Sequence, residues 1–183
     1  VKKITAPFDK DVVKSLKAGD NVLISGTIIA ARDAAHKALT ETLARGEALP
    51  VNLAGETIYY LGPSPAKPGD VIGAAGPTTS GRMDKYTPTM INEVGINGMI
   101  GKGYRSEAVV EAMKKSGCVY MVAIGGAGAL ISQSIKKYEV LAYPELGPEA
   151  VARLTVEDFP AIVAIDSEGN NFYEAGQAPY KKI

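Results

Sequence analysis

The sequence is poor in cysteine, histidine and tryptophan, and each scarcity narrows the kinds of site it can carry. Its 183 residues contain one cysteine, Cys118, one histidine, His36, and no tryptophan. A single thiol excludes an internal disulfide and any metal or cluster site built only from this chain's cysteines. We therefore expect no metal-ligating residues in this chain.

The chain also lacks an excess of charge and a long apolar run. Twenty lysines and arginines balance 20 aspartates and glutamates. Because nucleic-acid binding depends on a net basic surface, this balance argues against nucleic acid as a partner.

No apolar stretch approaches the roughly 18 residues of a membrane span, and the first residues, VKKITAPFDKDVV, contain no apolar segment typical of a signal peptide. We expect a cytoplasmic protein that does not bind membranes.

The composition is that of a folded globular domain. Hydrophobic residues make up 46% of the chain and charged residues 22%. Because 183 residues fall within the usual size of one domain, we expect residues 1–183 to form a single domain.

Apolar patterns in the first half predict several strands and one helix. Residues 21–31, NVLISGTIIAA, are typical of a buried strand, and Asp33 stands where an N-cap would begin a helix. One side of that helix is expected to consist of Ala35, Ala38, Leu39, Thr42 and Leu43. Short runs at 50–53, 57–61 and 70–75 are interpreted as strands of a meander or small barrel.

The second half alternates between helical and strand-like patterns. The expected elements are a helix at 86–94, a strand at 98–100, a helix from an N-cap at Ser106 to Gly117, a strand at 118–124, a helix to about Lys137, and a β-hairpin formed by 161–165 and 171–174 around the turn DSEG. Together the patterns predict an α/β fold with a β-rich first part and βαβ-like units after it.

Two short basic turns carry the strongest functional signal. Residues 76–84 read GPTTSGRMD, and residues 102–106 read KGYRS. Arginine offers a planar fork that fits carboxylate oxygens, lysine offers a point charge, and threonine offers a hydroxyl donor. The two turns together indicate a site for a small dicarboxylate.

Arg82 is the most informative residue of these turns. It follows Gly81 in a turn that Gly76 and Pro77 already constrain, and no amphipathic pattern requires a cation there. The alternative is a surface arginine paired with Asp84 or Glu93.

Other suggestive residues have simpler interpretations. Gly125, Gly126 and Gly128 follow a predicted strand but lack the spacing of a dinucleotide-binding fingerprint, which favours a tight turn over a phosphate site. An isolated histidine such as His36 is more often structural than catalytic. Cys118 begins an apolar strand and is expected to be an inert core thiol.

The chain resembles the β subunit, equivalently the C-terminal domain, of class I iron–sulfur hydro-lyases, the fumarase and tartrate dehydratase family. The blocks that carry the resemblance are SGTIIAARDAAHK at 25–37, GPTTSGRMD at 76–84, KGYRS at 102–106, AIGGAGAL at 123–130, and YPELGPEAV with VEDFPAIVAIDSEGNNF at 143–151 and 156–172. The arginine of GRMD and the KGYRS turn are more similar to the fumarase branch than to the tartrate branch.

The resemblance implies a swivelling β/β/α domain that closes against a separate α subunit. That partner would supply the cysteines of a [4Fe–4S] cluster whose open iron binds the substrate, and this chain alone would bind no cofactor and be inactive. The implied enzyme is a fumarate hydratase of the tricarboxylic acid cycle, a hydro-lyase that interconverts fumarate and (S)-malate.

The resemblance also assigns residues by position. Arg32, Thr78, Arg82 and Lys102 match the family's substrate-binding groups, and Thr78 also matches a threonine proposed to take part in proton transfer. The second-line candidates are Thr79, Arg105 and His36.

Two alternatives stay open at this point. The chain could be an L-tartrate dehydratase β subunit, because the substrates differ by one hydroxyl. It could also be a non-catalytic module that binds a dicarboxylate. Homo-dimerisation is left open as well.

Overall fold

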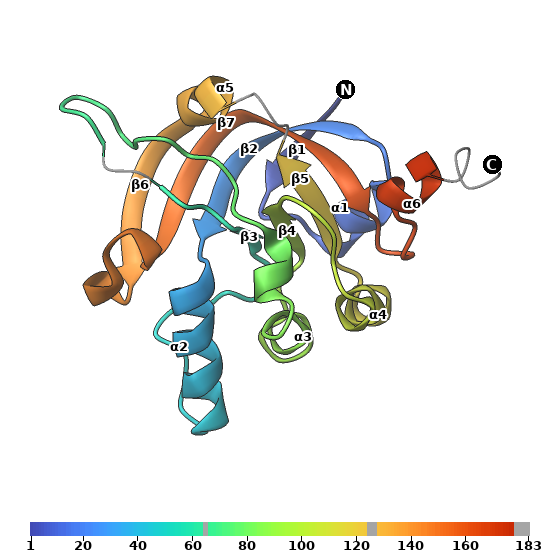
Figure 1. Cartoon of the computed structure of the whole chain (residues 1–183), viewed down its shortest axis with the longest axis horizontal. Coiled ribbons are helices and arrows are strands. Elements are labelled where there is room, and N and C mark those ends of the chain that lie inside the picture. Colours follow the sequence, from blue (N-terminus) through green and yellow to red (C-terminus); the bar gives the residue numbers. More distant parts are fainter. Residues whose placement is uncertain (64–65, 124–127, 178–183) are drawn as a thin grey trace.

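A mixed sheet organises the chain, and five of its strands close into a barrel-like arrangement (Figure 1). The computed structural model describes residues 1–63, 66–123 and 128–177. The strands are β1 (Lys2–Ala6), β2 (Asn21–Ala30), β3 (Thr57–Tyr59), β4 (Gly98–Gly101), β5 (Val119–Ala123), β6 (Ile135–Ala142) and β7 (Val151–Ile165). The helices are α1 (Lys10–Ser15), α2 (Asp33–Ala44), η1 (Ser80–Met83), α3 (Thr87–Thr89), η2 (Met90–Val94), α4 (Glu107–Ser116), α5 (Gly128–Ser134), η3 (Pro144–Glu149) and α6 (Phe172–Gln177).

Parallel pairing brings the ends of β2, β3 and β4 to one edge of the sheet. The strand order is β1-β2-β3-β4-β5-β7-β6, and β2 also pairs with β7, which closes the ring. β2–β3, β3–β4 and β4–β5 are parallel, whereas β7 is antiparallel to β2 and β5. The crossovers carry α2, α3 and α4, which lie together on one side of the sheet (Figure 1).

Strand periodicity divides the core into two clusters on opposite faces of the sheet. Ile28 and Tyr59 belong to one cluster, and their sequence neighbours Ile29 and Tyr60 belong to the other. The second cluster also contains the apolar faces of α2 and α4. Both faces of the central strands are therefore buried, as the near-continuous apolar runs in the sequence require.

The structure confirms the predicted mixed α/β class, the barrel, and most of the long elements. The strand predicted at 21–31 is β2, and the helical pattern at 86–94 is α3 followed by η2. Helix α4 begins at the expected cap, where the Ser106 Oγ accepts a hydrogen bond from the Val109 N–H at 3.4 Å. It ends at Gly117 in the left-handed conformation, with φ of 74°.

Two predicted strands in the first half are wrong. Residues 50–53 form no strand, because the Asn52 side chain accepts the Ala54 N–H at 3.0 Å and turns the chain locally. Residues 70–75 also form no strand, since Asp70 closes a turn with Lys67. Crossover connections, not the short turns of the predicted meander, join β2, β3 and β4, because these strands are parallel and parallel neighbours cannot be joined by a tight turn.

Three boundaries also differ from the predictions. Arg32, not Asp33, is the N-cap of α2. The helix expected to reach Lys137 ends at Ser134, because β6 begins at Ile135 and pairs with β7. The second hairpin strand at 171–174 is reduced to one bridge between Ile165 and Asn171, after which α6 begins.

Two further findings complete the fold. Among the described residues, no helix is long and apolar enough to cross a bilayer. The glycine turn predicted at 125–126, with its proposed choice between phosphate binding and close packing, lies outside the described residues.

Candidate dicarboxylate site

The candidate site lies where adjacent parallel strands end. Arg32 follows β2, Gly62 follows β3, and Lys102 follows β4. Neighbouring strands lie about 5 Å apart, so the segments that follow them are close in space. The carboxyl edge of a parallel sheet is also where open α/β sheets bind ligands.

The loop that carries Thr78 fits between the ends of β3 and β4. Pro77 forms an antiparallel bridge with Leu61, and Thr79 forms a parallel bridge with Lys102. The Thr78 N–H donates to the Tyr60 carbonyl at 2.8 Å. These backbone contacts place Thr78 between Arg32 and Lys102 along the edge of the sheet.

Arg82 reaches from this loop toward the start of α2. Its Nη2 lies 2.9 Å from the Asp33 Oδ2, and its Nη1 donates to the Thr78 Oγ1 at 3.5 Å. The side chain remains 59% exposed. The alternative of a surface pairing with Asp84 or Glu93 is wrong, because the ion-pair partner of Arg82 is Asp33.

Arg32 is held from the opposite side by η3. Its Nε lies 3.3 Å from the Glu149 Oε1, which also accepts the Ala34 N–H at 3.3 Å. A Cβ added to Gly62 would lie 2.6 Å from the Arg32 Nη1, so the guanidinium rests against the glycine backbone. Glu149 and Gly62 together fix the position of Arg32.

The two arginines keep hydrogen-bonding capacity despite their carboxylate neighbours. The Arg32 Nε and the Asp33 Oδ2 are buried atoms without a hydrogen-bond partner, so their ion pairs lack hydrogen-bond geometry. A guanidinium offers five N–H donors in a planar fork. A carboxylate ligand can therefore pair with each arginine without displacing a well-formed hydrogen bond.

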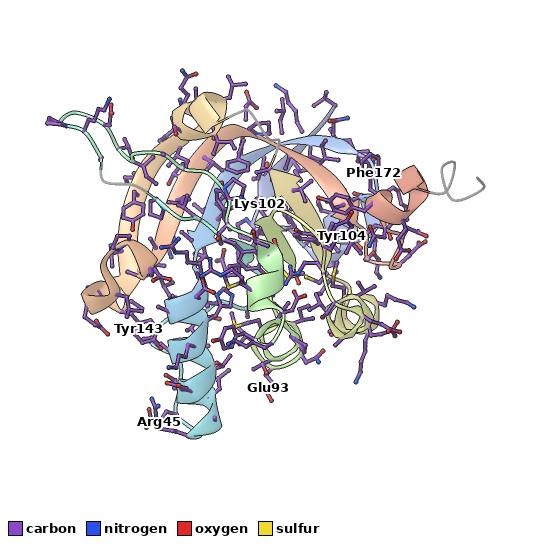
Figure 2. All side chains as sticks on the ribbon, in the orientation of Figure 1. Arg45, Glu93, Lys102, Tyr104, Tyr143 and Phe172 are labelled. Carbon is purple, nitrogen blue, oxygen red and sulfur yellow. The ribbon has the colours of Figure 1, made fainter. Side chains whose placement is uncertain are left out.

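Lys102 contributes an exposed ammonium on a fixed backbone. Its N–H donates to the Ser80 Oγ at 3.0 Å, and its carbonyl accepts the Ser80 N–H at 2.9 Å. Figure 2 shows Lys102 near the middle of the view, beside β4. Thr79, which bridges Lys102 through its backbone, is also exposed.

Comparison with known proteins identifies the family of this chain. The family model described as "Fumarase C-terminus" matches residues 3–176. The chain belongs to the fumarase C-terminus family. Two relatives are a "Fumarate hydratase class I, aerobic" from Salmonella typhimurium, 45% identical over 85% of this chain, and a "Fumarate hydratase 2" from Leishmania major, 42% identical over 91%.

The relatives differ in how much of their own length the chain covers. The chain spans 27% of the Salmonella typhimurium protein and 30% of the Leishmania major protein. It is also 41% identical to a "Putative L(+)-tartrate dehydratase subunit beta" from Methanocaldococcus jannaschii, over 95% of this chain and 92% of that protein. This fumarase C-terminal domain therefore has relatives both as a portion of longer hydratases and as a separate subunit.

Two second-line candidates lie inside the domain, away from solvent. The Arg105 side chain has no exposed surface and pairs with Asp84 at 2.7 Å. It also donates to the Tyr60 Oη at 3.1 Å and the Thr87 Oγ1 at 2.9 Å. Arg105 thus stabilises the core, and its guanidinium is shielded from solvent.

His36 is buried one turn into α2, where it supports Arg32. Its Nδ1 lies 2.8 Å from the Arg32 carbonyl, which only accepts, so Nδ1 carries the proton. The ring lies edge-on to Tyr60 and stacks on Tyr86, with centroids 5.5 and 6.0 Å away. Burial lowers the pKa of His36 to about 4, and the nearby Arg105 charge acts in the same direction.

This histidine predicts a pH dependence of stability. The unfolded chain binds a proton at His36 near pH 6.5, whereas the folded chain binds it only near pH 4, so stability is lost as pH falls through this window. We expect the free energy of unfolding to drop by about 2 kcal/mol between pH 7 and pH 5 through this group. Urea unfolding should show a smaller drop for His36→Gln, and an unchanged drop would contradict a neutral buried ring.

The residues of this domain do not fit a resident iron–sulfur cluster. Cys118 is fully buried, and burial raises its pKa to about 12, so the thiolate that a cluster requires is disfavoured. No group of histidine, cysteine or carboxylate side chains within the described ranges could hold a metal ion.

The sequence interpretation missed Asp33 and Glu149 as partners of the two arginines. Asp33 directly follows Arg32 but was assigned to a helix cap, and Glu149 stands in the block YPELGPEAV without a role. For Asp33 the available signal was its position directly after Arg32, whereas no pattern in the sequence connects Glu149 to an arginine. The pairing itself depends on the packing of η3 against α2.

Proposed function

We propose that the chain is the dicarboxylate-binding β subunit of a cytoplasmic class I fumarate hydratase. It would act with an α subunit that holds a [4Fe–4S] cluster, and the complex would interconvert fumarate and (S)-malate in the tricarboxylic acid cycle. The observation that carries the proposal is the gathering of Arg32, Thr78, Arg82 and Lys102 at one edge of the sheet. The hydratases among the relatives support the reaction class.

The four side chains suit the two ends of a small dianion. Arg82 and Lys102 would neutralise one carboxylate, and the Thr78 hydroxyl would donate to it. Arg32 would orient the other end. Because Asp33 and Glu149 already oppose the two arginines, the exposed Lys102 supplies the extra positive charge that favours a dianion.

The same cations can also stabilise the transition state of hydration. Adding hydroxide to one alkene carbon of fumarate places negative charge on the neighbouring carbon, where it spreads into the attached carboxylate as an aci-carboxylate. That carboxylate therefore gains charge during the reaction. Fixed cations beside it stabilise the transition state more than the ground state.

We assign Thr78 a second role in proton transfer. A threonine hydroxyl is a weak base, but the Arg82 Nη1 donates to its oxygen and favours the form that has lost a proton. In this proposal the hydroxyl would exchange a proton with the substrate carbon, and the Arg82 guanidinium would support its deprotonated form.

The cluster belongs, in this proposal, to the partner. The single buried cysteine of this chain cannot anchor it, and the Methanocaldococcus jannaschii relative bears the name of one subunit of a tartrate dehydratase. The chain alone should therefore be inactive.

Tartrate dehydration is the second candidate function. It is favoured by the match over nearly the full length of the Methanocaldococcus jannaschii subunit. A third possibility, from another class, is a module that binds a dicarboxylate without turning it over.

Anaerobic reconstitution distinguishes these functions. The chain is co-expressed with a candidate cysteine-bearing α subunit, and the complex is assayed with fumarate, malate and both tartrates. The proposal predicts a brown, oxygen-sensitive complex that prefers fumarate and malate. Preference for a tartrate would favour the second candidate, and a colourless monomer that binds malate would favour the module.

Gly62→Ala tests the placement of Arg32. The added methyl would overlap the Arg32 guanidinium, which must move, while the glycine does not adopt the left-handed backbone that disfavours alanine. We expect kcat/KM of the complex to fall about tenfold with little change in melting temperature. Gly76→Ala is the matched control, because a methyl added at Gly76 would have no other atom near it. Gly46→Ala is not suitable, because Gly46 has the left-handed φ of +71°, which disfavours alanine.

A further inference from the structure

A buried chain of hydrogen bonds lies directly beneath Lys102. The Lys102 N–H contacts the Ser80 Oγ at 3.0 Å, the Ser80 Oγ contacts the Tyr120 Oη at 2.8 Å, and that Oη contacts the Gly103 carbonyl at 2.8 Å. Ser80 and Tyr120 have no exposed surface. This series of hydrogen bonds begins at the Lys102 N–H and ends at the Gly103 carbonyl, so both of its ends are backbone groups beside the Lys102 side chain.

The chemistry of the groups fixes the direction of these bonds. The Gly103 carbonyl can only accept, so the Tyr120 hydroxyl donates to it and must accept from Ser80. Ser80 then donates to Tyr120 and accepts from the Lys102 N–H. Each hydroxyl in this series therefore donates one hydrogen bond and accepts one. Breaking any of these buried bonds would leave a polar group unpaired, which costs free energy of folding.

Close packing leaves this network little freedom to move. A methyl added at Gly101 would overlap the Ser80 Oγ and lie 2.7 Å from the Tyr60 ring. Behind Tyr120, the Arg105 guanidinium lies 4.9 Å from the ring centroid and is itself paired with Asp84. The network therefore ties Lys102, which directly follows β4, to β5 and to the segment that carries Arg82.

We propose that Ser80 and Tyr120 are positioning residues that hold Lys102 in place for the carboxylate of the substrate. This inference rests on the proposed function, because it assigns a purpose to the fixed backbone of Lys102. Neither residue touches the substrate. Both act through the Lys102 backbone, and together they convert a flexible exposed lysine into an ammonium carried on a rigid base.

Hydrogen–deuterium exchange tests the network without reference to any reaction. In the full chain, Tyr120→Phe and Ser80→Ala should each raise the exchange rate of amides at 101–104 about tenfold or more. The matched control is Asn97→Ala. Asn97 directly precedes β4, at the end of the strand opposite Lys102, and its substitution removes a buried hydrogen bond of 2.7 Å to the Phe8 carbonyl. Unchanged exchange at 101–104 in both variants would overturn the network.

A kinetic cycle on the reconstituted complex tests the role of the network. Tyr120→Phe should lower kcat/KM about tenfold when Lys102 is present, and less than about twofold in a Lys102→Ala background. Asn97→Ala should have the same small effect in both backgrounds. Equal losses from Tyr120→Phe in both backgrounds would overturn positioning through Lys102 and leave only a packing role.

The two experiments separate this inference from the proposed function. A complex of the wild-type chain with no hydratase activity would overturn the proposed function, whatever the exchange data show. An active wild-type complex in which Tyr120→Phe behaves like Asn97→Ala would overturn only the positioning role. Ser80→Ala repeats the cycle from the other end of the network, should Tyr120→Phe not fold.

Discussion

Replacing Arg82 by alanine should lower kcat/KM of the reconstituted complex about a hundredfold, with little change in the melting temperature of the chain. Removing one fixed cation from a developing charge costs on the order of 3 kcal/mol in the transition state. The ion pair with Asp33 is 59% exposed on the arginine side and contributes at most about 1 kcal/mol to folding. Steady-state kinetics and thermal unfolding of the same preparation measure both effects.

Arg45→Ala is the matched control for this prediction. Arg45 is 56% exposed and pairs with Glu47 at 3.2 Å, but it lies at the far end of α2 from the site (Figure 2). It should leave both kinetics and unfolding unchanged. If Arg82→Ala lost activity and stability in proportion, Arg82 would be a structural residue, and the substrate-binding role would be wrong.

Arg105→Met should show the opposite pattern, with a loss of about 3–5 kcal/mol in the free energy of unfolding. The side chain has no exposed surface, and its removal leaves the Asp84 carboxylate largely buried without its 2.7 Å partner. The Tyr60 and Thr87 hydroxyls also lose a charged donor. For a chain of this size the loss corresponds to a fall of about 10 °C in melting temperature.

A second substitution distinguishes a buried charge from simple loss of packing. Asp84→Asn in the Arg105→Met background removes the uncompensated carboxylate and should restore part of the lost stability. Arg153→Met, at a partly exposed arginine 3.7 Å from Glu139, should cost little stability. A melting temperature for Arg105→Met within 2 °C of wild type, a threshold of about 1 kcal/mol, would contradict the structural role.

Local sequence patterns were sufficient for the elements whose residues decide their own conformation. The β-branched run of β2 and the capped, amphipathic helix α4 each combine propensity, periodicity and end signals. The predicted α/β class followed from these elements. Because residue propensity, periodicity and end signals all favour the same structure in these elements, their type and approximate bounds could be predicted.

Elements that depend on distant partners could not be predicted in the same way. Ile135–Ala142 has an exposed pattern on both faces and becomes β6 only because β7 pairs with it. The short β3 is a strand because it lies between β2 and β4, whereas residues 50–53 and 70–75, also predicted as strands, have no such neighbours. Tertiary pairing, not propensity, decides these segments.

The candidate site shows the same division. The two glycine-containing turns pointed to Thr78, Arg82 and Lys102 from their residue types, whereas Arg32 was assigned only through the family resemblance. The partners of these residues were not visible, since Glu149 lies more than a hundred positions from Arg32 and meets it only through η3. Arg105, a cation in an equally suggestive turn, proved to be part of the core.

The central claim is that the loops at Arg32, Thr78–Arg82 and Lys102 bind one dicarboxylate together. The most direct measurement is a crystal structure of the anaerobic complex with bound malate. We predict carboxylate oxygens within about 3 Å of the Arg82 guanidinium and the Lys102 ammonium, with Arg32 on the other end of the molecule. Malate bound elsewhere, with these three side chains facing solvent, would contradict the account.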